Sequence, residues 1–131
     1  MRLIVRLLFA AGFAAAAAVC ASADQTPALN KVMRAKLGHS QAILAAVITS
    51  DWASLDRESR ALAMAVRDPA WGAALTAPEY IRHSDAFSRA LQDLIEASAR
   101  RDEEAAGNAH IMLTTSCVRC HVLMTRRRIA K

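Results

Sequence analysis

Near its C-terminal end the chain carries the segment Cys117-Val118-Arg119-Cys120-His121, in which two thiols lie three positions apart and a histidine follows at once. On a helix, residues three and four positions apart share one face, so these three side chains can point to the same side. Each thiol can then form a thioether with one vinyl group of a porphyrin while the imidazole faces the iron. The spacing predicts one covalently attached haem c, with Cys117 and Cys120 as tethers and His121 as the proximal iron ligand.

Two other kinds of site share the C-x-x-C spacing, a redox-active dithiol and one half of a zinc site. A redox dithiol usually opens a helix in a βαβ unit, and zinc needs further cysteine or histidine ligands at matching spacing. The sequence offers neither context, since its one remaining cysteine is Cys20. The sequence therefore favours haem attachment over both alternatives.

The first 23 residues have the layout of an export signal. Arg2 and Arg6 flank the start of an apolar run over residues 7–19, and small residues at 21–23 would allow cleavage before Asp24. The run is shorter than the ~20 residues that a membrane span needs. Haem c is attached on the outer side of the bacterial inner membrane, so we expect a cleaved signal peptide at 1–23 and a periplasmic protein.

Cys20 leaves open a lipid-attached form, although Val19 before it is a poor fit to that modification. The remaining residues, 24–131, have the size of one domain, which we expect to carry the haem. Removing Arg2 and Arg6 lowers the formal charge from +5 to +3. Two haem propionates would offset much of that charge, and no basic stripe interleaved with aromatic residues occurs, so nucleic acid is not an expected partner.

Helical periodicity fills the mature chain, and strand signals are missing. Apolar side chains recur three and four positions apart and predict helices at about 26–49, 51–67, 77–100 and 103–126. The segment 70–75 is predicted to be irregular. Four helices with short connections pack most simply as an all-α, antiparallel up-down-up-down four-helix bundle.

Capping residues support three of these helix starts. Ser50 or Asp51 can cap the second helix, and Asp102 can cap the fourth. The run Thr76-Ala77-Pro78-Glu79 has the pattern of a capping box with proline in the first turn, and predicts the start of the third.

In the predicted bundle the first and last helices are adjacent and antiparallel, which brings Met33 to the level of His121. A thioether there could bind iron, or Met33 could be an ordinary core residue, as methionines at helical spacing usually are. His110 lies about 16 Å from His121 along the same helix, and His39 about 9 Å from Met33 along another. His83 is at the right level but flanks the polar side of its helix. We expect Met33 to be the distal iron ligand and these three histidines to be surface or boundary residues.

The sequence resembles the class II cytochromes c, which include the cytochromes c-prime and their low-spin relatives. In that family the C-x-x-C-H motif lies near the C-terminus, as Cys117 to His121 do here, and an early helix-one residue faces the iron. The resemblance implies a four-helix bundle with one haem and a methionine or bulky apolar residue on the distal side, a position that Met33 matches. Two positions differ, because Thr125 and Leu29 stand where many cytochromes c-prime have basic residues.

These features predict a periplasmic electron carrier that exchanges electrons with redox partner proteins. Ligation by one histidine and one methionine suits iron that passes electrons rather than binds substrate, and no catalytic acid–base pair is recognisable, so no enzyme activity is predicted. If Met33 only shields a five-coordinate iron, the alternative is a protein that binds nitric oxide or carbon monoxide. A third reading is a subunit that docks on a larger oxidoreductase through Trp52 or Trp71. Many family members are dimers, which makes a homodimer an open alternative to a monomer.

Overall fold

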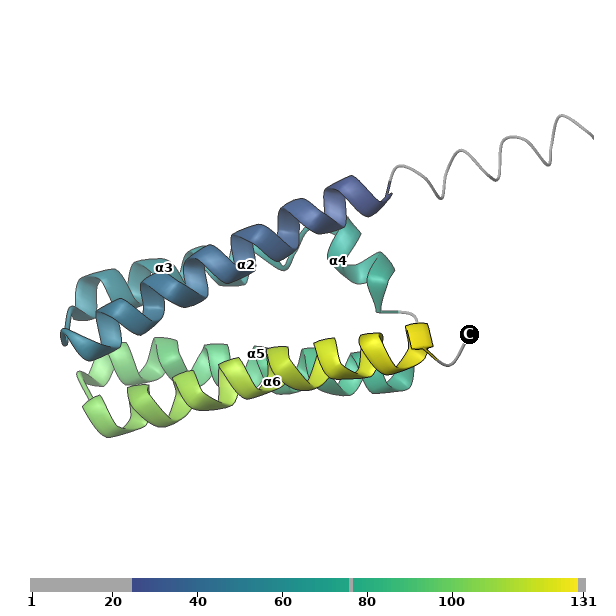
Figure 1. Cartoon of the computed structure of the whole chain (residues 1–131). Helices are drawn as coiled ribbons and strands as arrows, with labels where there is room; N and C mark the ends of the chain where they lie inside the picture. The colour runs from purple at the N-terminus through teal and green to yellow at the C-terminus, as the bar shows by residue number, and fades with distance from the viewer. Residues whose placement is uncertain (1–24, 76, 130–131) are drawn as a thin grey trace, which may run out of the picture.

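The computed structural model describes residues 25–75 and 77–129, and every element in these ranges is a helix (Figure 1). The helices are α2 (Gln25–Ile48), α3 (Trp52–Ala65), α4 (Pro69–Ala74), α5 (Pro78–Arg100) and α6 (Glu103–Ile129). The predicted all-helical class is therefore confirmed, and the four long helices lie within a few residues of their predicted bounds. The predicted export signal at 1–23 lies outside the described residues.

The prediction that residues 70–75 are irregular was wrong, because α4 forms there. The side chain of Asp68 accepts a hydrogen bond from the backbone N–H of Ala70 at 2.8 Å, and Pro69 occupies the first turn. Proline is favoured at that position because a backbone N–H there would have no partner within the helix. The described part of the chain thus has five helices rather than four.

Two of the predicted caps are present. Asp51 Oδ1 accepts a hydrogen bond from the N–H of Ser54 at 3.0 Å, and Asp102 Oδ1 accepts one from Ala105 at 2.9 Å. The N-cap of α5 is Ala77, and Pro78 lies in the first turn as predicted. The third predicted cap is a capping box. Its first residue, Thr76, lies outside the described residues.

The helices pack in two adjacent pairs, α2 along α3 and α5 along α6, with α3 against α5 and a smaller contact between α2 and α6. Their apolar faces enclose a core in which the most deeply buried side chains are Ile43, Leu55, Leu62, Leu94 and Leu113. Figure 1 shows α2 and α6 diverging toward the end where α4 lies. The core therefore fills one end of the structure, and the residues of the C-x-x-C-H motif lie toward the other.

Candidate functional site

A cavity of about 520 Å³ lies where α2 and α6 diverge. Its walls come from α2, α5 and α6, and Trp71 of α4 contributes a buried indole. No carboxylate occurs among the described side chains that line this cavity. These side chains are Met33, Arg34, Lys36, Leu37, Ser40, Trp71, His83, Ser84, Phe87, Thr114, Ser116, Cys117, Val118, Cys120 and His121. This volume lies within the range of ordinary ligand pockets, about 300–1,000 Å³.

Helix α6 brings Cys117, Cys120 and His121 to the wall of this cavity. Both thiols are free and half-buried. Burial raises the pKa of the Cys120 thiol above its usual value, the Lys36 ammonium opposes that shift, and the neighbouring Cys117 adds to it.

The opposite wall of the cavity is α2, which contributes Met33. Met33 is half-buried and starts a run of α2 residues that face the cavity, with Lys36, Leu37 and Ser40 after it. The structure therefore brings Met33 and the three motif residues Cys117, Cys120 and His121 to one cavity.

Lys36 is a cavity residue that the sequence patterns did not single out. Its Nζ lies 3.6 Å from the centroid of the Trp71 ring and 4.0 Å from that of Phe87. An ammonium over aromatic faces is attracted to the negative potential of the rings. This contact joins α2, α4 and α5 inside the cavity, and the only sequence signal for it is that Lys36 follows Met33 by three positions.

Burial lowers the pKa of Lys36 from its usual 10.5 to about 8, although negative charge on Cys117 and Cys120 would raise it. At neutral pH the haem-free chain therefore holds a protonated amine at an energetic cost. A shift of this size corresponds to about 3 kcal/mol, at 1.36 kcal/mol per pKa unit.

We expect the haem-free chain to gain stability through this amine as pH rises from about 8 to about 10.5. In that window the unfolded chain keeps the proton that the folded chain has released, so stability rises with pH. Above pH 9 the raised pKa of Cys120 lowers the stability as pH rises. The urea unfolding of the parent is therefore compared with that of Lys36→Met, which keeps Cys120. The parent should gain up to about 3 kcal/mol relative to the variant across this window, and parallel pH profiles would contradict the burial of the charge.

His83 is half-buried, as a boundary residue would be, and it also lines the cavity. It lies four positions before Phe87, whose buried ring faces the same space. That spacing places His83 on the inward face of α5. It is the sequence feature from which the cavity position of His83 could have been predicted.

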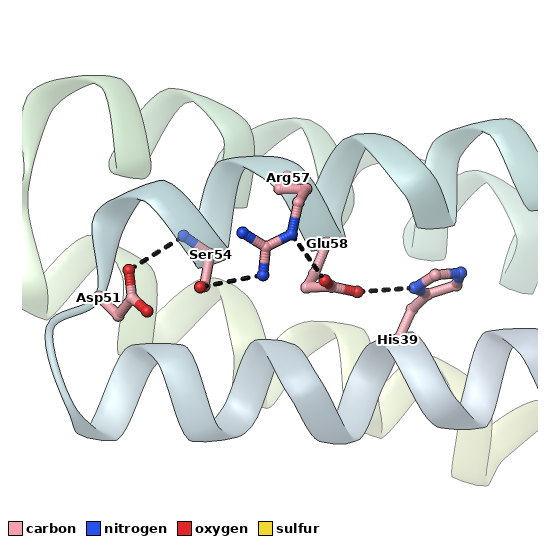
Figure 2. A network of polar contacts seen from close by, with 5 residues as sticks. All are labelled: His39, Asp51, Ser54, Arg57 and Glu58. Carbon is pink, nitrogen blue, oxygen red and sulfur yellow. Dashed lines mark hydrogen bonds and ion pairs between the residues drawn. The ribbon is translucent and has the colours of Figure 1, made fainter.

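The other two histidines, His39 and His110, lie outside the cavity lining. His39 Nδ1 lies 2.9 Å from Glu58 Oε2, an interaction that joins α2 to α3, and Arg57 Nε donates to the other oxygen of Glu58 at 3.1 Å (Figure 2). The hydrogen bond with His39 is the main cause that lowers the pKa of the Glu58 carboxyl. His110 is half-buried, and its Nε2 has no hydrogen-bond partner among the described residues.

Comparisons with protein-family models, with curated proteins and with solved structures give no match to this chain. In the described ranges, no three histidine, cysteine, aspartate or glutamate side chains gather as a site for a metal ion. None of the described helices is long and apolar enough to cross a membrane.

The cavity residues fit a haem group. The lining is largely apolar and includes the buried rings of Trp71 and Phe87, which suit a flat, hydrophobic macrocycle. Two thiols three positions apart on α6 reach the same space, together with one imidazole. These are the side chains needed to tether a haem and to ligate its iron.

Proposed function

We propose that this chain is a c-type cytochrome of class II that transfers electrons through one covalently attached haem. Cys117 and Cys120 would hold the haem by thioethers, His121 would be the proximal iron ligand and Met33 the distal one. The observation that carries this proposal is that all four side chains line one cavity of about 520 Å³. Three of them come from the C-terminal half of α6 and Met33 from the opposite wall on α2.

A bound haem supplies one-electron chemistry at its iron. The residues of this chain bind it and shape its surroundings. The buried rings of Phe87 and Trp71 provide apolar surface around the site, which would limit the access of water there and favour a high potential. Met33 as a second iron ligand would raise the potential further and would leave no iron position open to a substrate, which suits electron transfer.

We infer an up-down-up-down arrangement of the four long helices, with α4 inserted between α3 and α5. Two features support it: the short connections after α2 and α5, and the packing of α2 with both α3 and α6. The proposal also includes a signal peptide at 1–23, export to the periplasm and a redox partner protein there.

Visible spectra of the haem-loaded protein, oxidised and reduced, with and without carbon monoxide, test this function. We expect sharp, split reduced bands that carbon monoxide does not change, because Met33 fills the distal position. Met33→Leu keeps the volume but removes the sulfur, so its ferrous spectrum should shift with carbon monoxide. Met64→Leu is the matched control, because Met64 is 61 % exposed on α3 and outside the cavity lining.

Broad high-spin bands of the parent that shift with carbon monoxide would contradict distal ligation by Met33. That result would favour the alternative function, a five-coordinate iron that binds carbon monoxide or nitric oxide behind an apolar wall.

A further inference from the structure

Lys36 shares the α2 wall of the cavity with Met33. Residues three positions apart lie on one face of a helix, and both side chains line the same space. Nζ of Lys36 lies 3.6 Å from the centroid of the Trp71 ring and 4.0 Å from that of Phe87. These contacts hold the charged end of Lys36 inside the cavity rather than in solvent. The α2 wall therefore offers two donor atoms, a sulfur and a nitrogen.

The charge of Lys36 has no counter-charge among the described cavity residues. The other titratable side chains that line the cavity are Arg34 on α2, His83 on α5, and Cys117, Cys120 and His121 on α6, and α4 contributes only Trp71. A buried charge without an ionic partner is costly. The cost disappears if the cavity ligand supplies an anion, or if the amine gives up its proton and donates its lone pair to a metal.

The surroundings of Lys36 favour loss of the proton and donation of the nitrogen lone pair to a metal. Lys36 lines the same cavity as Cys117 and Cys120, the expected attachment points of the two vinyl groups. The propionates of a haem lie on the edge opposite its vinyl groups. A haem tethered at these cysteines would turn its acidic groups away from Lys36, and Lys36 would face the macrocycle.

We propose, on the basis of the function proposed above, that Lys36 is a second distal iron ligand, whose amine binds ferric iron while Met33 binds ferrous iron. Nitrogen donors suit the harder ferric ion, and thioethers suit the softer ferrous ion. The Lys36 ammonium releases one proton to solvent when its nitrogen donates its lone pair. When the redox partner protein delivers one electron, the amine leaves and takes up a proton, and the sulfur of Met33 takes its place.

Electron paramagnetic resonance of the ferric protein and the visible spectrum of the ferrous protein test this assignment. Lys36→Arg keeps the charge and the stacking on Trp71 and Phe87, but a guanidinium does not lose its proton and cannot ligate. We expect ferric Lys36→Arg to lack the low-spin signal of the parent. Its ferrous bands should equal those of the parent. Met33→Leu should keep the ferric signal of the parent and change its ferrous bands.

A rescue experiment separates ligation from a structural effect. Lys36→Ala leaves space in the cavity, and added methylamine should restore the ferric signal of the parent. A Lys36→Arg signal identical to the parent, or a Lys36→Ala signal that methylamine does not restore, overturns the assignment of Lys36 and leaves the proposed function standing. A parent protein that carries no covalent haem when produced with a haem-attachment system overturns both.

Discussion

The double variant Cys117→Ala, Cys120→Ala is expected to carry no haem that survives denaturation, whereas the parent is expected to carry one per chain. Both thiols line the cavity and neither forms a disulfide, so each is free to form a thioether. Without them the only bonds to the haem would be axial ligands, which denaturation breaks. Haem staining of a denaturing gel, after production with a haem-attachment system, measures the difference.

Single variants and a nearby control make this result specific. Cys117→Ala and Cys120→Ala each keep one thiol and should retain some covalent haem. Arg119→Ala changes an exposed residue between the two cysteines and should stain like the parent. Covalent haem in the double variant would show that attachment does not use these thiols.

Leu94→Ala is expected to lower the free energy of unfolding by about 2–5 kcal/mol, the usual cost of truncating a fully buried leucine. Leu94 lies on α5 with no exposed surface, inside the cluster that joins the four long helices. Domains of this size are stable by only about 5–15 kcal/mol, so this loss is a large share of the total.

Leu44→Ala is the matched control, because Leu44 is 43 % exposed on α2. It should cost less than about 1 kcal/mol in the same urea unfolding experiment. Equal losses at the two positions would contradict the packing of α5 at the centre of the core.

The sequence predicted the long helices because their signals are local. Apolar residues repeat with helical spacing, and Asp51 and Asp102 accept hydrogen bonds from the N–H groups that each helix start leaves free. Helix α4 was missed because its six residues are too few to show a periodic stripe. Asp68 and Pro69 directly follow the predicted helix at 51–67, and the same pair starts α4.

The sequence predicted the part of the candidate site that depends on spacing within one helix, which is Cys117, Cys120 and His121. Lys36 was not predicted, because its inward position depends on Trp71, which only the folding of α4 brings to the cavity. A lysine in a helical pattern ordinarily marks the solvent face, since its charge is costly to bury. Aromatic rings from two other helices reverse that expectation here.

The measurement that tests the central claim most directly is the intact mass of the protein purified from the periplasm of a host that attaches haem c. We expect the mass of residues 24–131 plus one haem. A mass equal to the polypeptide alone, from a host that loads a known c-type cytochrome in the same experiment, would contradict it.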